Sequence, residues 1–199
     1  IMAKGRDLKG LRKLLFFKAL AIGQMYEPYR SFSWTYQLQL FVMRKLVFSK
    51  WHEALGGKLV SIVSGGASLN PRIARILWAA GFKIMEGYGL TETSPVIAVS
   101  NFLHGGVKIG TVGPVLPGVE IKFADDGEIL VRGPNVMLGY YNRPDRTAEV
   151  IDKEGWLHTG DIGRMIDNKF LQITDRKKEI FKTSGGKYIA PQVLENRFK

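Results

Sequence analysis

The stretch of this chain best suited to chemistry runs from Glu86 to Pro95 and reads EGYGLTETSP. Two glycines flank Tyr88, which lets the backbone turn tightly and pass close to a flat ligand. The hydroxyl of Thr91 can donate a hydrogen bond to a phosphate oxygen. The neighbouring carboxylate of Glu92 is repelled by phosphate unless a cation lies between them, so it indicates Mg²⁺. A polar turn that only links two strands is the alternative interpretation.

The common catalytic and nucleotide-binding motifs do not match this chain. Glu92 stands where a dinucleotide fingerprint needs its third glycine, and Gly185-Gly186-Lys187 is followed by Tyr188 rather than by the Ser or Thr of a P-loop. The segment Gly66 to Asn70 ends in asparagine where the hydrolase motif G-x-S-x-G needs glycine. The three histidines are scattered, whereas a metal site needs clustered ligands.

The net charge of +11 is the unusual bulk property of the chain. Basic residues gather at Lys4–Lys18 and Arg176–Lys187, and such clusters suit nucleic acid or an anionic membrane surface. Neither cluster carries interleaved aromatic residues or a nucleic-acid-binding module, so we expect no nucleic-acid partner. We favour solvated faces whose neutralising partners lie in sequence outside this chain. Contact of the first helix with a membrane surface is the remaining alternative.

Length and composition bound the class of protein. With 199 residues and 45% apolar content, the chain can bury a sizeable core as one domain or two small ones. The lack of cysteine excludes disulfides, cysteine-ligated zinc and thiol catalysis, and it agrees with a reducing compartment. No apolar run approaches the ~18 residues needed to span a bilayer. Charges interrupt every apolar stretch between Ile1 and Arg12, so we expect no signal peptide there and interpret the chain as a fragment.

Three amphipathic helices are predicted before the central stretch. Their apolar positions recur at helical spacing, and we expect them to face the core. They are Leu8, Leu11, Leu15, Ala19 and Ile22 in the first helix, Tyr36, Leu40, Met43, Val47 and Trp51 in the second, and Ile73, Ile76, Leu77 and Ala80 in the third. Gly56-Gly57 ends the second helix, and Asn70 caps the third with Pro71 at its first position.

Two short apolar runs, Leu59–Val63 and Phe82–Met85, bracket the third helix and are predicted to be buried strands. A strand–loop–helix–strand unit implies a parallel sheet with right-handed crossovers. The loops 64–68 and 86–95 then leave the carboxyl ends of adjacent strands, where open α/β sheets bind ligands. We therefore expect both loops to face one cleft.

The pattern changes near residues 100–106, where we place a domain boundary. The run Val119–Phe123 alternates and returns as Glu128–Arg132 after Asp126-Gly127, which indicates a hairpin. A second hairpin is predicted over 162–173, and a short helical turn over 144–150. The predicted fold class is α/β plus β, with a partial parallel α/β sheet layer followed by a small antiparallel β-barrel-like subdomain. The predicted domains are 1–105, 106–174 and 175–199.

The segment Tyr88–Thr93, YGLTET, closely resembles the signature of the AMP-forming adenylating enzymes, which include acyl-CoA synthetases, luciferases and peptide-synthetase adenylation domains. Further segments resemble the same family in its order: SGGA at 64–67, GEILVRGP through GYY within 127–141, TGD at 159–161 and DRKKEIFK at 175–182. These five segments cover roughly residues 58–195, so chance is a poor explanation. The upstream helices and residues 58–67 are most similar to bacterial long-chain fatty-acyl-CoA synthetases.

The resemblance implies a nucleotide site. The residues it assigns to nucleotide binding are Gly65, Gly66, Ala67, Glu86, Gly87, Tyr88, Gly89, Thr91, Asp161 and Arg176. In this assignment the ring of Tyr88 stacks on adenine, Thr91 holds an α-phosphate oxygen and Glu92 binds Mg²⁺. Asp161 accepts hydrogen bonds from the ribose hydroxyls, and Arg176 reaches the ribose or the α-phosphate. The segment 127–141 is assigned a structural role beneath the site.

The resemblance also implies a domain hinge and a second half-reaction. Lys178 aligns with the pivot between the large and small domains, and Lys182 with a lysine used in thioester formation. Gly185-Gly186 aligns with a loop near the incoming thiol. For the two lysines a solvated charge run is the alternative interpretation.

The activity implied by the resemblance is ATP-dependent activation of a fatty acid to an acyl adenylate and its transfer to CoA. The expected small molecules are therefore a fatty acid, ATP, Mg²⁺ and CoA, with the rest of the same polypeptide as a partner and a cytoplasmic location. Peripheral contact at the inner membrane face is left open. Two alternatives remain: an adenylation domain of a peptide synthetase, and a basic, non-catalytic binding module. We expect the chain alone to be inactive.

Overall fold

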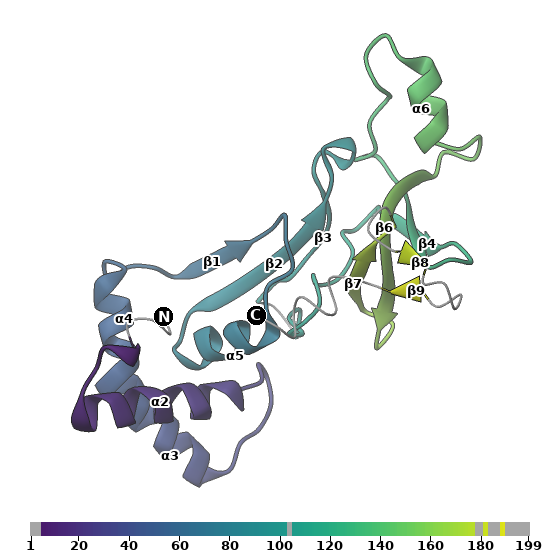
Figure 1. Cartoon of the computed structure of the whole chain (residues 1–199). Helices are drawn as coiled ribbons and strands as arrows, with labels where there is room; N and C mark the ends of the chain where they lie inside the picture. The colour runs from purple at the N-terminus through teal and green to yellow at the C-terminus, as the bar shows by residue number, and fades with distance from the viewer. Residues whose placement is uncertain (1–4, 103–104, 178–180, 183–187, 190–199) are drawn as a thin grey trace. The chain divides into compact units, whose positions relative to one another are not determined.

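Figure 1 shows the computed structural model of the chain, which describes residues 5–102, 105–177, 181–182 and 188–189. Backbone contacts divide the chain into two units. The first unit comprises Ile1–Ser64 and Leu69–Met85, and the second comprises Gly65–Ser68 and Glu86–Lys199. The domain limits expected from the sequence, at 105 and 174, stay a prediction. The sequence also predicts the start of a helix over residues 191–198, with Val193, Leu194 and Phe198 on its apolar side, and this segment lies outside the described residues.

The first unit contains the predicted helices. Their bounds are α2 Gly10–Gln24, α3 Trp34–Met43, a π-helical turn η1 Arg44–Phe48, α4 Ser49–Ala54 and α5 Pro71–Ala79. The second predicted helix is thus interrupted by a π turn, and it ends before Gly56 and Gly57, whose φ angles are +82° and +71°. The start of α5 is confirmed, since the side chain of Asn70 accepts a hydrogen bond from the backbone N–H of Arg72 at 2.9 Å.

The core of the first unit lies where these helices meet. Tyr36, Leu40, Met43 and Val47 are buried as predicted. Two predicted core positions are wrong, because Leu11 is 69% exposed and Ile73 is 44% exposed. In α2 the predicted core positions Ala19 and Ile22 are buried, together with Phe16, Leu20 and Gly23, which the prediction did not include. Because α2 has apolar residues on most of its circumference, its spacing pattern does not fix which side faces inward.

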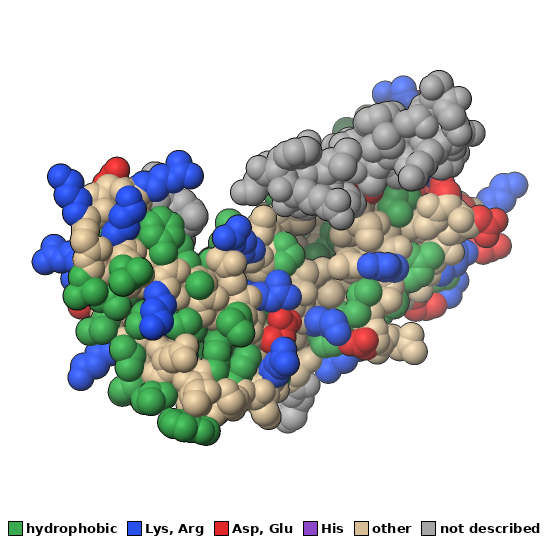
Figure 2. All heavy atoms as spheres, turned by 60° about the horizontal axis from the view of Figure 1, so that its bottom comes forward, with side chains coloured by type: hydrophobic (Ala, Val, Ile, Leu, Met, Phe, Trp, Pro, Cys, Tyr) green, Lys and Arg blue, Asp and Glu red, His purple; other side chains and the backbone are tan. Residues whose placement is uncertain are grey.

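The outer surface of these helices is mixed rather than purely charged. Leu14 is 65% exposed and Trp34 is 74% exposed. Figure 2 shows hydrophobic side chains interspersed with lysine and arginine on the face it displays. The helical spacing of α2 also predicts lysines and arginines on the side opposite its apolar positions, but the exposed Leu11 and Leu14 show that the solvent-facing side carries apolar residues as well. Within the described residues, no helix is long and apolar enough to cross a membrane.

A three-stranded sheet contains the first part of the stretch 86–95, and its strand order is β1-β2-β3. The strands are β1 Ser61–Ser64, β2 Lys83–Gly89 and β3 Val96–Val99. The strand expected to end at Met85 therefore continues to Gly89, so the first part of the stretch 86–95 is strand rather than loop. β3 returns antiparallel to β2, with Tyr88 opposite Ala98. The prediction that this first strand is buried on both faces is wrong, because Val63 in β1 is 67% exposed.

The second unit is built on a four-stranded antiparallel sheet in the order β4-β5-β6-β7. Its strands are β4 Glu120–Phe123, β5 Glu128–Arg132, β6 Leu157–Ile166 and β7 Phe170–Arg176, and α6 spans Pro144–Val150. A two-residue pair, β8 Phe181–Lys182 with β9 Tyr188–Ile189, follows. Ile97, Ile129, Val131 and Leu171 are buried in the core of this unit. Both predicted hairpins and the predicted fold class, α/β plus β, are confirmed.

Candidate functional site

The turn between β2 and β3 is held by a buried threonine. The short 3₁₀ helix η2, Thr91–Thr93, forms this turn. Thr93 is fully buried; its Oγ1 accepts a hydrogen bond from the backbone N–H of Leu90 at 2.9 Å and lies 2.8 Å from the carbonyl oxygen of Pro95. Thr91 itself is exposed and Glu92 is half-buried. The turn therefore presents a hydroxyl and a carboxylate to the surroundings while Thr93 fixes the backbone.

Gly89 is required by the protein's own backbone. A Cβ atom at Gly89 would overlap the carbonyl oxygen of Pro95, and the pairing register shifts between Tyr88 and Gly89. The group that comes close to Gly89 is the backbone of the returning chain at Pro95. The glycine at this position is therefore explained by the protein's own fold, without the flat ligand expected from the sequence. Glycine at this position lets β3 fold back and places Tyr88 at the end of the regular ladder.

Tyr88, Asp161 and Arg176 meet although they lie far apart in the sequence. The hydroxyl of Tyr88 donates to Oδ2 of Asp161 at 2.8 Å. Nε of Arg176 lies 3.4 Å from Oδ1 of the same carboxylate, and the two residues are direct partners across β6 and β7. Asp161 is 5% exposed. The structure thus joins three of the residues predicted to bind the nucleoside.

Burial dominates the electrostatics of this cluster. Burial raises the pKa of Tyr88, and the negative charge of Asp161 raises it further, so the phenol remains a hydrogen-bond donor. Burial also raises the pKa of Asp161, although the hydrogen bond from Tyr88 and the charge of Arg176 lower it in part. The carboxylate is therefore poorly solvated, and further hydrogen-bond donors would stabilise its charged form.

The loop after β1 lies beside the same strand. A Cβ atom built on Gly65 would lie 3.8 Å from the carbonyl oxygen of Gly87, the residue before Tyr88. Gly66 has φ +78°, a left-handed conformation that favours glycine. Gly65, Gly66 and Ala67 are all exposed, so their backbone groups are accessible. The two glycine-bearing segments are neighbours at Gly65 and Gly87.

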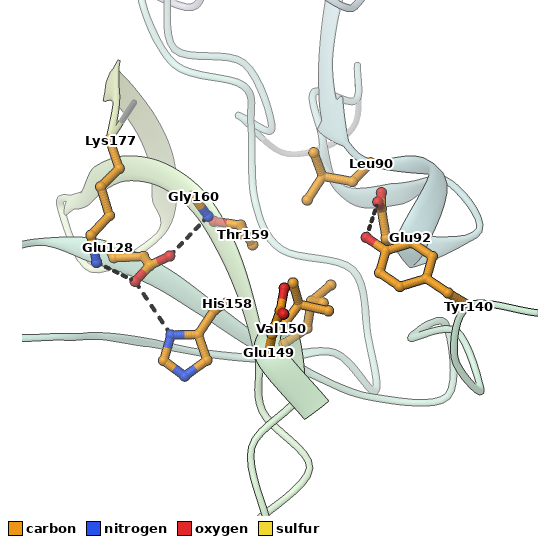
Figure 3. Close-up of a pocket in the computed structure, with 11 residues that line it drawn as sticks. Leu90, Glu92, Glu128, Tyr140, Glu149, Val150, His158, Thr159, Gly160 and Lys177 are labelled. Carbon is orange, nitrogen blue, oxygen red and sulfur yellow. Dashed lines mark hydrogen bonds and ion pairs between the residues drawn. The ribbon is translucent and has the colours of Figure 1, made fainter. Parts of the chain in front are cut away.

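A hollow of about 360 Å³ opens between the turn and the second sheet. Its lining includes Glu92, Glu128, Tyr140, His158, Thr159, Gly160 and Lys177 (Figure 3). The hydroxyl of Tyr140 donates to Oε1 of Glu92 at 2.8 Å. This hydrogen bond raises the pKa of Tyr140. From the sequence, Tyr140 is assigned only a structural role. Its position after Gly139 in the family segment marks it as a motif residue, but nothing in the spacing predicts a contact with Glu92.

Glu128 forms a second network that sequence analysis missed. It is 4% exposed, and its Oε1 accepts a hydrogen bond from the backbone N–H of Gly160 at 2.9 Å. Its Oε2 lies 2.9 Å from Nζ of Lys177 and 3.3 Å from Nδ1 of His158 (Figure 3). Burial alone would raise the pKa of Glu128, but the bonds from Lys177, Gly160 and His158 outweigh it and lower the pKa. The buried group is therefore held as a carboxylate.

Several predicted site residues are not placed. Lys178, Gly185 and Gly186 lie outside the described residues. Lys182 is in β8 opposite Tyr188, and only its backbone is described. Within the described part of the chain, no group of three or more His, Cys, Asp or Glu side chains could hold a metal ion by itself. A cation at Glu92 would therefore need oxygen ligands from a substrate or from water.

Comparisons with known proteins identify the family and the fold. Residues 11–141 match the AMP-binding enzyme family, and the chain belongs to that family. It is 48% identical over 158 residues to long-chain-fatty-acid–CoA ligase FadD15 of Mycobacterium bovis, covering 79% of this chain and 26% of that protein. It is 42% identical over 164 residues to human long-chain-fatty-acid–CoA ligase 1, covering 76% and 23%. The chain thus spans about a quarter of the length of these relatives.

Solved structures of adenylate-forming enzymes show the same fold. O-succinylbenzoate coenzyme A synthetase from Bacillus subtilis, in complex with ATP and magnesium ion, matches with a TM-score of 0.62 and 28% identity, covering 81% of this chain and 34% of that one. Apo MatB from Rhodopseudomonas palustris matches with a TM-score of 0.61 and 28% identity, covering 80% and 33%. The predicted relation to the adenylate-forming enzymes is confirmed.

Proposed function

We propose that this chain carries part of the nucleotide site of an AMP-forming ligase that activates a fatty acid with ATP and transfers it to CoA. The observation that supports the proposal most is the contact between Tyr88 and Asp161, because it joins two motifs of the family that are remote in sequence. The long-chain specificity is proposed because the relatives are long-chain-fatty-acid–CoA ligases. The reaction class is proposed from family membership.

The nucleoside would bind against Tyr88 and Asp161. A tyrosine ring offers a stacking surface for a purine, and the exposed backbone of Gly65 to Ala67 offers hydrogen-bonding groups beside it. Asp161 is nearly buried and short of solvent, so two ribose hydroxyls would supply donors that stabilise its charge. Arg176 lies on the other carboxylate oxygen and keeps a positive charge next to it.

The phosphates would lie at the turn of Thr91 and Glu92. Thr91 is exposed and free to donate to an α-phosphate oxygen. Glu92 fits a magnesium ligand, because Mg²⁺ is held in such sites by one or two carboxylates together with substrate phosphates. Tyr140 would fix the orientation of that carboxylate through its hydrogen bond. When bound, Mg²⁺ supplies charge neutralisation between the carboxylate and the phosphates.

The chemical reason for adenylation is the leaving group. A free carboxylate would have to expel oxide on attack by a thiol, whereas an acyl adenylate expels AMP. Attack of the fatty-acid carboxylate on the α-phosphorus forms the mixed anhydride and releases pyrophosphate. The protein's part is to position the reactants and to stabilise the charge that develops. Lys178 as hinge and Lys182 in the thioester step are further proposals that rest on the family motif alone.

A mutation at Asp161 tests the proposal directly. In the full-length protein that carries this chain, Asp161→Asn should raise the KM for ATP at least about tenfold, because it removes a charge-assisted bond to the ribose. Asp167→Asn is the matched control, since Asp167 lies in the exposed turn between β6 and β7. An unchanged KM for ATP in Asp161→Asn would overturn the assignment.

Two further experiments separate the alternatives. Assaying the full-length protein with fatty acids and with amino acids, using CoA as acceptor, distinguishes a fatty-acid ligase from a peptide-synthetase adenylation domain. Glu92→Gln should abolish most adenylation, and unchanged adenylation would favour a non-catalytic or differently organised site.

The purified 199-residue chain should bind AMP weakly and form no acyl-CoA, and detection of acyl-CoA would refute that expectation.

A further inference from the structure

A closed ring of hydrogen bonds includes the residues adjacent to Asp161 and Arg176. Oε1 of Glu128 accepts from the backbone N–H of Gly160 at 2.9 Å, and the carbonyl oxygen of Gly160 accepts from the backbone N–H of Lys177 at 2.8 Å. Nζ of Lys177 then returns to Oε2 of Glu128 at 2.9 Å. We call these three residues the Glu128 ring. It joins β5, β6 and the end of β7 through one buried carboxylate (Figure 3).

The ring holds the residues next to both proposed nucleoside ligands. Gly160 precedes Asp161, and Lys177 follows Arg176. Asp161 and Arg176 are the last pair of the β6–β7 ladder, so the Gly160–Lys177 bond extends the pairing one step beyond them. Without this hydrogen bond, the last residue pair of the ladder would have a bonded neighbour on one side only, and the two strand ends could separate more easily. The ring therefore closes the open end of the ladder at the site.

The charged groups around Glu128 stabilise the contacts of the Glu128 ring. Lys177 also lies 2.7 Å from Oδ2 of Asp126, so its ammonium group bridges two carboxylates on the β4–β5 hairpin. His158 adds a third group on Glu128, and its Nε2 lies 4.0 Å from Asp152. Glu128 is 4% exposed, and a carboxylate so deeply buried is tolerated only when its lone pairs are satisfied. All of its partners point to the same short segment of β6 and to the end of β7.

We propose that Glu128 is a positioning residue that holds Asp161 and Arg176 in the geometry that binds the nucleoside of ATP. The inference rests on the proposed function, and it assigns to the glycine–glutamate motif a role beyond building the sheet. Glu128 does not touch the ligand in this proposal. It acts through the backbone of Gly160 and through Lys177.

Substitutions of the ring separate positioning from simple stability. Glu128→Gln keeps an oxygen for the Gly160 N–H but removes the charge that holds Lys177. Lys177→Met removes the ammonium group and leaves the backbone bond, and Lys177→Arg retains a charge that can reach both carboxylates. In the full-length protein, Glu128→Gln and Lys177→Met should each raise the KM for ATP about tenfold, with the KM for the fatty acid and kcat unchanged within about twofold. Lys177→Arg should restore most of the ATP affinity.

A double-mutant cycle and a matched control complete the test. Because both residues act through one ring, Glu128→Gln combined with Lys177→Met should raise the KM for ATP by less than the product of the single effects. Glu120→Gln is the control: Glu120 pairs with Arg132 on the same sheet at 2.7 Å, but on its exposed surface. It should leave all three constants unchanged.

The possible results are distinct. If Glu128→Gln does not fold, Lys177→Met still reports on the ring. If Asp161→Asn raises the KM for ATP but both ring variants leave it unchanged, the positioning role is wrong and the nucleotide site stands. If all three leave it unchanged, the proposed function is wrong. Equal rises in the KM for ATP and for the fatty acid would indicate a general structural defect and would overturn the positioning role.

Discussion

Substitution of Tyr88 by phenylalanine separates the two roles assigned to this residue. Phenylalanine keeps the ring that would stack on adenine and removes only the hydroxyl that donates to Asp161 at 2.8 Å. Hydrogen bonds to charged groups contribute ~1.5–3 kcal/mol, and Arg176 remains beside the carboxylate at 3.4 Å. We therefore expect Tyr88→Phe to lower the free energy of unfolding by about 1.5–2 kcal/mol, near the lower end of that range.

The cost in stability is linked to the pKa of Asp161. The bond from Tyr88 lowers that pKa against the larger effect of burial. Removing the hydroxyl should therefore raise the pKa of Asp161 further, and each unit of the rise corresponds to ~1.4 kcal/mol. A group whose pKa is raised by folding destabilises the fold progressively as pH rises through the folded value. The loss of stability in Tyr88→Phe should thus be larger at neutral pH than in acid.

Two measurements test this reasoning. Urea unfolding of the chain and of Tyr88→Phe, at neutral and acid pH, gives the change in unfolding free energy, and carboxyl chemical shifts in an NMR titration give the pKa of Asp161. Tyr141→Phe is the matched control, because Tyr141 is 93% exposed. If Tyr88→Phe unfolds like the control and leaves the pKa of Asp161 unchanged, the buried hydrogen bond does not contribute as argued.

AMP binding tests the aromatic ring of Tyr88 rather than its hydroxyl. Tyr88→Phe should bind AMP within about threefold of the unchanged chain, since the stacking surface is retained. Tyr88→Ala should bind it about five- to 150-fold more weakly, because stacking of a base on an aromatic ring contributes ~1–3 kcal/mol. Titration calorimetry measures both affinities. Equal affinity of the alanine and phenylalanine variants would refute stacking on Tyr88.

Three other substitutions probe the elements around the site. Thr93→Val keeps the shape of a fully buried side chain but leaves the backbone N–H of Leu90 without the Thr93 hydroxyl as acceptor. Urea unfolding should therefore show a free energy of unfolding lower by about 1–2 kcal/mol, and an unchanged value would mean that the hydroxyl does not fix the turn. Tyr140→Phe removes the donor to Glu92, so ATP turnover should need several-fold more Mg²⁺, and an unchanged Mg²⁺ dependence would contradict a magnesium role for that carboxylate. Folding lowers the pKa of Glu128, so the stability it contributes is present above the usual glutamate pKa of ~4.3 and is lost as pH falls through the lower folded value. The difference in unfolding free energy between the unchanged chain and Glu128→Gln should therefore shrink in acid, and a difference that grows would show that the sign is wrong.

The sequence predicts the local elements of the second unit well because their signals are local. Asp167 and Asn168 have φ angles of +52° and +50°, which suit the two central positions of a tight turn, and with Lys169 they connect the paired residues Ile166 and Phe170. Pro144 begins a helix whose observed bounds match the prediction. In the first unit, Asn70 caps α5 as expected for the same reason. In each case the residues that determine the structure lie within a few positions of it.

The extent of β2 could not be predicted in the same way. Glu86 to Gly89 contains two glycines in four residues, a composition typical of turns. These residues form a strand because β3 pairs with them and because Gly89 admits the carbonyl of Pro95. The pairing partner and the close approach are tertiary features. The partners of Glu128 are missing from the sequence prediction for the same reason, since Gly160 and Lys177 lie 32 and 49 positions away.

The proposed site depends on one irregularity in the β6–β7 ladder. From Ile166 opposite Phe170 to Gly163 opposite Ile173, the pairing follows a single register, whereas Asp161 is opposite Arg176 in a register shifted by one residue. Continued without this bulge, the ladder would set Asp175 opposite Asp161 and place two carboxylates together. Such a one-residue shift also exchanges the faces on which side chains lie. The bulge therefore turns a repulsive pair into the Asp161–Arg176 pair, and bulges are known to aim side chains in this way beside active sites. Because neither strand alone reveals the shift, the motifs on β6 and β7 identify the residues of the site but only the folded ladder brings the correct two together.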